Sequence, residues 1–160
     1  MPVLSLSDLT ARIAADRAVG RTVALANGCF DVLHVGHVRY LQGAAGEADR
    51  LVVAVNDDAS VRRLKGAGRP IMSAPDRAEL VAAVRGVDYV VIFGGKTVGE
   101  VLQAIKPDVH CKGTDYTVES VPERALVASY GGRTAIVGDP KDHSTRGLLA
   151  RVRDTVPPGP

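Results

Sequence analysis

The chain has 160 residues, the size of one domain, and its 46% hydrophobic and 24% charged residues are proportions typical of a globular protein rather than a disordered or fibrous one. The longest apolar runs, Leu51–Val55 and Tyr89–Phe93, are far shorter than a membrane span, and the first residues lack a secretion-signal pattern, so we expect a cytoplasmic protein. A net charge of +2 disfavours binding of long nucleic acids through their phosphates. The two cysteines, Cys29 and Cys111, are distant in sequence, which favours free thiols over a disulfide.

The hydrophobic pattern alternates between helix-like segments and short β-branched runs. Ser7 is a candidate N-cap for the first helix, and Gly20 is expected to end it. Ser73, followed by Pro75 and Asp76, predicts the start of another helix. In chain order we predict a helix at 7–19, a strand at 22–26, a helix at 35–45, a strand at 50–55, a short helix from 57 or 58 to 64, a helix at 73–84, a strand at 89–93, a helix at 98–105, a strand at 109–111, a helix at 122–130, a strand at 134–137 and a helix at 144–152.

Five short apolar strands that alternate with helices predict an α/β fold, a single Rossmann-like domain with a doubly wound five-stranded parallel sheet. We expect an N-terminal helix within residues 1–21, the main domain at 22–153 and a flexible tail at 154–160. In such sheets ligands bind beyond the carboxyl ends of the strands, where the winding direction reverses. The loops after the first, second, fourth and fifth strands are therefore the candidate binding loops.

The loop after the first strand, Asn27–His37, carries the strongest functional signal. Gly28 permits a tight turn near a ligand, and Gly36 has no side chain to obstruct a phosphate. His34 and His37 are three residues apart at a helix start, so their rings are expected on one face beside the unpaired N–H groups of that helix. These features predict a polyphosphate site. A zinc site would need a third ligand, which the spacing does not supply, and a purely structural role for the histidines is the other alternative.

The His34–His37 segment resembles the HxGH signature of the nucleotidyltransferase superfamily, whose domains are cytidylyltransferase-like. The whole segment Asn27–His37, together with 53–61, 64–70 and 111–116, is most similar to the D-glycero-β-D-manno-heptose 1-phosphate adenylyltransferases. The resemblance covers about residues 22–150. It implies transfer of AMP from ATP to a sugar 1-phosphate, which yields ADP-heptose and pyrophosphate.

The resemblance, with the loop chemistry, implies three groups of site residues. His34, His37 and Lys65 are the expected catalytic groups, which contact the phosphates. The expected nucleotide-binding residues are Asn27, Gly28, Cys29, Phe30, Asp31, Gly36, Arg69, Ser144 and Thr145. The expected acceptor-binding residues are Asp31, Lys112 and Asp115. No protein ligand to a metal is expected, since Mg²⁺ would be held mainly by the triphosphate and water. Solvated lysines and arginines, an ordinary turn at 112–116 and a plain N-cap at Ser144 are the alternatives without function.

Other features leave the nucleotide and the activity open. Arg85–Asp88 resembles the Arg-Tyr-Val-Asp of glycerol-phosphate cytidylyltransferases, which keeps CTP open as the nucleotide. Asp139 and Pro140 replace the Arg-Thr of that branch, which argues against it. Arg146 replaces a threonine common in the heptose enzymes, so the hydroxyl contact of that threonine is not expected here. The alternatives are CTP-dependent transfer to glycerol 3-phosphate or another phospho-alcohol, a non-catalytic nucleotide sensor and, remotely, a relative of the tRNA-charging enzymes. We expect small-molecule substrates, no nucleic acid or membrane partner, and a homodimer.

Overall fold

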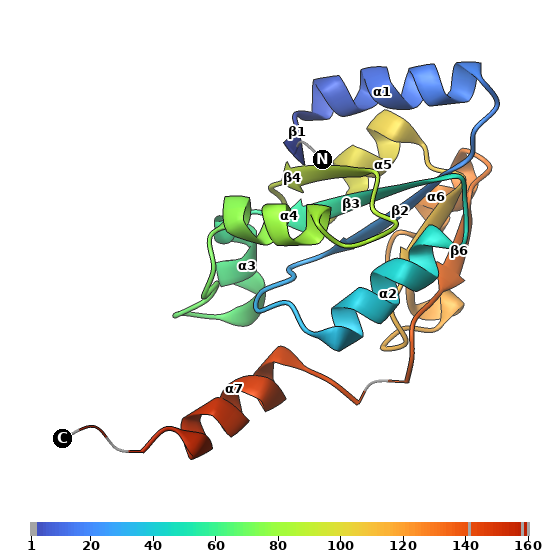
Figure 1. The fold of residues 1–160 in the computed structure, drawn as a ribbon. Coiled ribbons are helices and arrows are strands. Elements are labelled where there is room, and N and C mark those ends of the chain that lie inside the picture. The colour runs from blue at the N-terminus through green and yellow to red at the C-terminus, as the bar shows by residue number, and fades with distance from the viewer. Residues whose placement is uncertain (1–2, 141, 158, 160) are drawn as a thin grey trace.

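A computed structural model describes residues 3–140, 142–157 and 159, and it shows an α/β fold built on a parallel sheet (Figure 1). The strand order is β1-β4-β3-β2-β5-β6, and every neighbouring pair is parallel. The strands are β1 (Val3–Leu4), β2 (Val23–Gly28), β3 (Arg50–Asn56), β4 (Tyr89–Phe93), β5 (Val109–Lys112) and β6 (Arg133–Ile136).

The predicted doubly wound parallel sheet is confirmed, but the predicted count of five strands is wrong because β1 adds a sixth. Val3 and Leu4 pair with Val90 and Val91 at the outer edge of β4. Two residues are too few to show the alternation that predicts a strand, and only the exposed edge of β4 gives them a partner. The predicted N-cap Ser7 is also wrong. Ser5 caps the first helix by accepting a hydrogen bond from the backbone N–H of Asp8.

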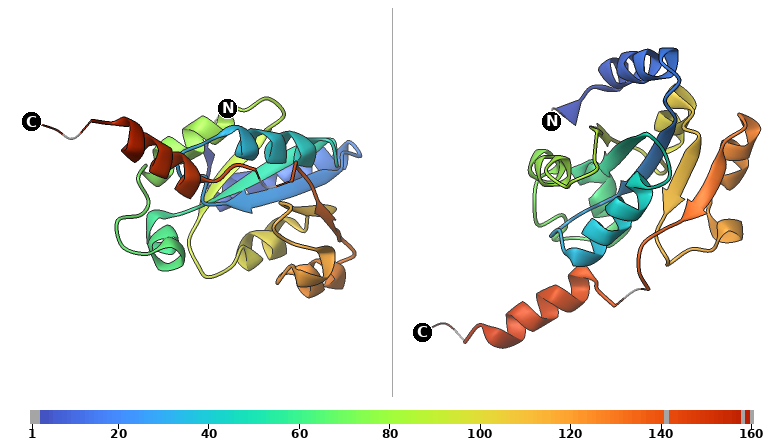
Figure 2. Two further views of the ribbon diagram at one scale, coloured as in Figure 1. Left: turned by 90° about the horizontal axis from the view of Figure 1, so that it is seen from below. Right: turned by 45° about the vertical axis from the view of Figure 1, so that its right-hand side comes forward.

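Helices cover both faces of the sheet (Figure 2, left). Their bounds are α1 (Leu6–Ala18), α2 (Val35–Ala45), α3 (Asp58–Lys65), α4 (Ala74–Ala82), α5 (Gly99–Ile105), α6 (Arg124–Ser129) and α7 (Thr145–Thr155), with a 3₁₀ turn η1 at Val118–Ser120. The predicted Ser73 cap of α4 is confirmed. None of the helices in the described part of the chain is long and apolar enough to cross a membrane.

Alternation along the central strands divides the core between the two faces. On β3, Leu51, Val53 and Val55 join the cluster beneath α2 and α4, while Val52 and Ala54 join the cluster beneath α1, α5 and α6. All five side chains are buried, as parallel strands covered on both faces require. Rigid packing on both faces fixes the carboxyl ends of the strands, which carry the candidate site.

The strand order reverses between β2 and β5, so the crevice of the fold lies at the carboxyl ends of these neighbouring strands. The loops after β2, β3, β5 and β6 meet at this edge. Helix α7 follows the β6 loop and projects away from the sheet, with no fully buried residue (Figure 1; Figure 2, right). It runs through Thr155, so the stretch predicted as a tail begins inside a helix, and residues 158 and 160 lie outside the described residues.

Candidate functional site

The loop between β2 and α2 has an unusual backbone shape. Phe30 (φ 50°) and Val32 (φ 59°) both lie in the left-handed region, which a β-branched side chain such as that of Val32 rarely adopts. Gly28 lets the Phe30 ring fold back beneath the turn, because a Cβ at Gly28 would lie 3.2 Å from the ring. The loop thereby delivers the chain to the start of α2 with His34 as the N-cap.

His34 and His37 cap this helix reciprocally. Nδ1 of His34 accepts a hydrogen bond from the backbone N–H of Gly36 at 3.2 Å. Nδ1 of His37 accepts one from the backbone N–H of His34 at 3.3 Å. The two rings stack with their centroids 3.9 Å apart, as the three-residue spacing predicts.

The stacked pair continues into the protein as a series of aromatic contacts. His37 packs edge-on against Phe30 with ring centroids 5.4 Å apart, and Phe30 stacks with Tyr40 at 6.4 Å. The Tyr40 hydroxyl donates to the carbonyl of Cys111 on β5 at 2.8 Å. The orientation of the histidines is therefore supported by contacts that reach the next strand of the sheet.

Both imidazoles are neutral near pH 7. Burial and the nearby His143 lower the pKa of His34 below its ordinary value of 6.5. Burial and the neighbouring His34 and Lys65 lower the pKa of His37 to about 4. Since each Nδ1 accepts a backbone hydrogen bond, each neutral ring carries its proton on Nε2. The pair thus presents two neutral N–H donors at a helix N-terminus, where an anion is favoured.

Asp31 anchors the loop to the segment before α4. Its buried carboxylate accepts hydrogen bonds from Arg69 Nε at 2.8 Å and from the backbone N–H groups of Ile71 and Met72. Burial alone would raise the pKa of Asp31, but these backbone bonds and the Arg69 guanidinium together lower it. Asp31 is therefore ionised, and it holds Arg69 at the rim of the site.

A second helix N-terminus approaches the same loop. Ser144 caps α7 by accepting from the N–H of Gly147 at 3.0 Å, and the Thr145 hydroxyl donates to the carbonyl of Asp31 at 2.8 Å. A Cβ at Gly36 would lie 3.3 Å from the Cβ of His143, so Gly36 permits this close approach. The structure thus brings the predicted Ser144 and Thr145 to the predicted histidine loop.

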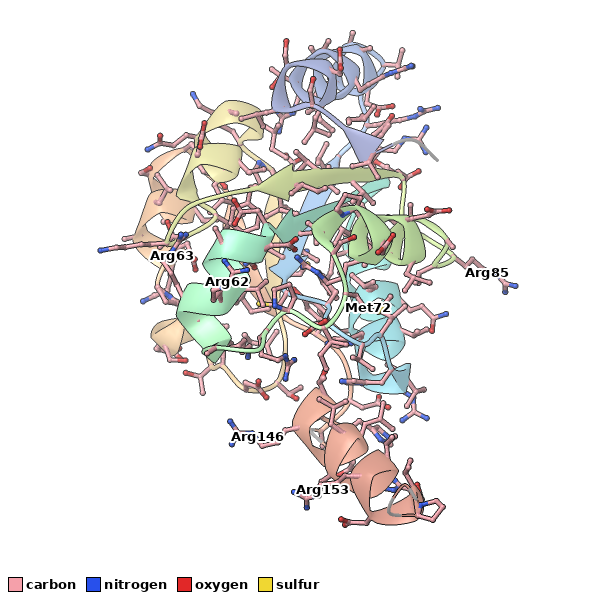
Figure 3. The ribbon with its side chains drawn as sticks, turned by 90° about the vertical axis from the view of Figure 1, so that its left-hand side faces the viewer. Arg62, Arg63, Met72, Arg85, Arg146 and Arg153 are labelled. Carbon is pink, nitrogen blue, oxygen red and sulfur yellow. The ribbon has the colours of Figure 1, made fainter. Side chains whose placement is uncertain are left out.

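Two predicted lysines lie at this edge of the sheet. Lys65 is exposed at the end of α3, near enough for its charge to affect the pKa of His37. Lys112 ends β5, where burial lowers its pKa and its ammonium lies 4.7 Å from the centre of the Tyr116 ring. Asp115 is exposed in the loop that follows β5. Arg146, by contrast, projects outward from α7 (Figure 3).

Arg77 is an important residue that sequence reasoning missed. Although fully buried, it donates to the carbonyls of Cys29 and Met72 and to the carboxylate of Asp58. These partners belong to the β2–α2 loop, the segment before α4 and the start of α3, so one cation joins three parts of the rim. An arginine within an amphipathic helix pattern predicts a solvated side chain, and no local signal shows its burial.

The Asn27 and Cys29 side chains also have partners in the sheet. Asn27 Oδ1 accepts from Nε2 of buried His110 on β5 at 2.9 Å. The Cys29 thiol lies 3.9 Å from Asn56 Oδ1 at the end of β3, and burial raises its pKa. A raised pKa disfavours the thiolate, so Cys29 is poorly suited to act as a nucleophile.

The arrangement suits a polyphosphate. Two helix N-termini, two neutral N–H donors and the cations Lys65 and Arg69 lie around one loop. Among the described residues, no group of three or more histidine, cysteine or acidic side chains could hold a metal ion. The carboxylates of Asp31 and Asp58 are paired with Arg69 and Arg77. The residues present therefore fit a Mg²⁺ carried by the ligand's phosphates better than one held by the protein.

These features define an α/β protein in which two helix N-termini, a stacked histidine pair and two cations lie near the switch point of its sheet. Residues 25–148 match the cytidylyltransferase-like family, and the chain belongs to this family of nucleotidyltransferases. The predicted membership in that superfamily is thereby confirmed.

Relatives agree with this assignment, and a solved structure shares the fold. The bifunctional protein HldE of Pseudomonas paraeruginosa is 46% identical over 151 residues, which cover 94% of this chain and 32% of that protein. HldE of Pelobacter propionicus is 48% identical over 144 residues, with 90% and 30% covered. The chain thus spans about a third of the length of these relatives. The crystal structure of the lipopolysaccharide core biosynthesis protein from Thermoplasma volcanium GSS1 shares the fold, with a TM-score of 0.66 and 24% identity over 76% of this chain and 100% of that one.

Proposed function

We propose that the protein transfers AMP from ATP to a sugar 1-phosphate, D-glycero-β-D-manno-heptose 1-phosphate, and releases pyrophosphate. The observation that carries the nucleotide part is the pair of neutral Nε2–H donors that His34 and His37 present at the start of α2. The choice of ATP and heptose is supported by the sequence segments shared with heptose 1-phosphate adenylyltransferases and by the identity to HldE.

The reaction is a phosphoryl-centred displacement. An oxygen of the acceptor's 1-phosphate attacks the α-phosphorus of ATP and forms a new P–O bond. The bond between the α-phosphorus and the oxygen that bridges it to the β-phosphorus breaks, and pyrophosphate leaves with that electron pair. The attacking phosphate is already ionised near pH 7, so the site needs alignment and charge stabilisation rather than a strong base.

Each site residue has a role that follows from its place. His34 and His37 donate through Nε2 to phosphate oxygens on which charge develops, and Lys65 balances the charge of the leaving pyrophosphate. Arg69, held by Asp31, adds positive charge at the rim. Because its own carboxylate is engaged, Asp31 would meet the ligands through its loop and through Arg69. A Mg²⁺ ion bound to the triphosphate supplies further charge neutralisation.

The remaining predicted residues complete the two halves of the site. Lys112 and Asp115 lie beside the switch point and would bind the acceptor. The nucleotide would meet the backbone and side chains of the β2–α2 loop together with the start of α7, which comprise Asn27, Gly28, Cys29, Phe30, Gly36, Ser144 and Thr145.

The test compares nucleotides and acceptors in one assay. Pyrophosphate release is measured with ATP and with CTP, each against heptose 1-phosphates of both anomers, hexose 1-phosphates and glycerol 3-phosphate. We expect release with ATP and a heptose 1-phosphate. Faster release with CTP and glycerol 3-phosphate would establish the cytidylyl alternative, and nucleotide binding without release for any acceptor would establish a sensor. Light scattering coupled to size-exclusion chromatography tests the expected homodimer.

A further inference from the structure

His110 is a fully buried histidine outside the loops that carry the proposed phosphate contacts. It lies on β5, and its Nε2 is 2.9 Å from Oδ1 of Asn27 on β2. β2 and β5 are the neighbouring strands between which the strand order reverses. The hydrogen bond therefore joins the two strands directly below the crevice in which this kind of sheet binds ligands.

The chemistry of the two groups fixes which one donates. An amide oxygen only accepts, so Nε2 of His110 carries the proton in this bond. Burial and the nearby Lys112 lower the pKa of His110 to about 3, so the ring stays neutral and its Nδ1 is an acceptor. In the described part of the chain, nothing donates to that Nδ1.

A histidine at this position is costly for packing alone. A buried acceptor without a partner destabilises a fold, and a leucine would fill similar space without that cost. Among the described residues, the interaction that offsets this cost is the hydrogen bond to Asn27, a half-buried side chain beside Gly28 in the site.

We propose that His110 is a positioning residue that fixes the side-chain amide of Asn27, so that Asn27 Nδ2 donates to the bound nucleotide. An amide is planar, so a bond at Oδ1 also sets the direction of the Nδ2–H groups. No hydrogen bond within residues 3–140 and 142–157 occupies that Nδ2. The inference rests on the proposed nucleotide site and adds to it a specific donor and its support.

Three substitutions separate positioning from packing. His110→Leu removes the donor at similar volume, and His110→Gln keeps an N–H donor close to the place of Nε2. Thr134→Val is the matched control, because Thr134 pairs with His110 across β5 and β6 and its buried hydroxyl likewise lacks a partner among the described residues. Each protein is titrated with ATP, and with CTP in parallel, by calorimetry without acceptor; kcat/KM and Tm are also measured.

We expect His110→Leu to weaken ATP binding and to lower kcat/KM about tenfold, while His110→Gln stays within about threefold and Thr134→Val matches the wild type. Asn27→Ala should show the same loss, and Asn27→Ala/His110→Leu should be no worse than Asn27→Ala alone, because the two residues act as a unit. Wild-type affinity in a folded His110→Leu protein, or losses that multiply in the double variant, would overturn the inference.

Two further readouts keep the test decisive. If His110→Leu does not fold, Asn27→Ala and His110→Gln still test the inference. It requires weaker ATP binding in the Asn27→Ala protein and near-normal ATP binding in the His110→Gln protein. The titrations need no acceptor, so they test His110 even if the wild type transfers no nucleotide. Absence of pyrophosphate release from the wild type would refute the proposed function alone.

Discussion

The guanidinium of Arg77 is fully buried and lies 2.8 Å from the carboxylate of Asp58, whose side chain is 42% exposed. The pair joins α4 to the first turn of α3, and the same guanidinium donates to the carbonyls of Met72 and Cys29. One side chain therefore satisfies two backbone acceptors and one charge at the edge of the site. The shape of that edge depends on a residue that the ligand need not touch.

We expect Arg77→Leu to lower the free energy of unfolding by about 3 kcal/mol or more, because two backbone carbonyls and the Asp58 carboxylate would lose a fully buried donor. Urea denaturation measures the change. Arg63→Leu is the control, since Arg63 is exposed on α3 and its hydrogen bond to the carbonyl of Gly95 lies at the surface, so its loss should cost no more than about 1 kcal/mol. Equal effects of the two substitutions would contradict the role assigned to Arg77.

The tautomers of the two loop histidines can be observed directly. We expect long-range ¹H–¹⁵N spectra of the free protein at pH 7 to show His34 and His37 neutral, with the proton on Nε2 in both rings. His37 should become protonated only near pH 4, since burial and its cationic neighbours lower its pKa. A proton on Nδ1 in either ring would disagree with the reciprocal capping bonds.

Loss of either histidine should slow turnover much more than it weakens the fold. We expect His34→Ala or His37→Ala to lower kcat about 10²–10³-fold, the range found when a positioned donor to a developing charge is removed. Steady-state pyrophosphate release gives kcat, and circular dichroism confirms folding. Near-normal turnover in a folded His37→Ala protein would refute the proposed displacement mechanism.

Lys65 should act chiefly on the nucleotide. In the proposed mechanism Lys65 lies near the β- and γ-phosphates, so we expect Lys65→Ala to lower kcat/KM for ATP about 10–100-fold, the equivalent of one charged hydrogen bond. Arg62→Ala, an exposed cation on the same helix, is the control. An unchanged kcat/KM in the Lys65→Ala protein would exclude the proposed contact.

Acid stability should depend on Asp16, which is buried at the opposite end of the sheet. Burial alone would raise the pKa of Asp16, but bonds from Tyr89, Arg21 and Arg50 outweigh it and lower the pKa below 3.8. The stabilisation is therefore fully present above the unfolded-state pKa and is lost as pH falls through the lower folded-state pKa.

We accordingly expect Asp16→Asn to destabilise the protein by about 1.5–3 kcal/mol at pH 7 and by clearly less at pH 2–3. Urea denaturation at several pH values measures both. Asp139→Asn removes an ion pair with Arg39 whose side chains are each about half exposed, so it should change stability by no more than about 1 kcal/mol. A constant effect of Asp16→Asn across this pH range would show that the carboxylate charge does not stabilise the fold.

Much of the fold could be predicted from the sequence, because its signals are local. The strands near 50–55 and 89–93 are apolar on both faces, and Ser73 with Pro75 marks a helix start by its own chemistry. Strand β1 could not be predicted, since its two residues become a strand only when β4 offers an edge. The cap at Ser5 has a local signal, an aspartate three residues later, that distinguishes it from Ser7.

The same difference between local signals and long-range contacts applies to the candidate site. The histidine loop and the Ser144–Thr145 helix start are contiguous motifs, and the fold brings them together. The supporting contacts join residues that are distant in sequence, such as Arg77 with Cys29 and His110 with Asn27. No spacing rule connects such pairs, and a buried arginine or histidine looks the same in a sequence as a solvated one.

Asp31 stands between two residues in an unfavourable backbone conformation, Phe30 and Val32. A left-handed conformation costs about 1–2 kcal/mol for a residue other than glycine, and more strain is expected for a branched side chain. The bonds to the Asp31 carboxylate and the Thr145 bond to its carbonyl keep the turn in place. Folding itself thus sets the preorganisation of the turn, so an arriving phosphate need not remodel it. A Val32→Gly protein would have less backbone strain in the turn, but the turn would be less preorganised for a phosphate.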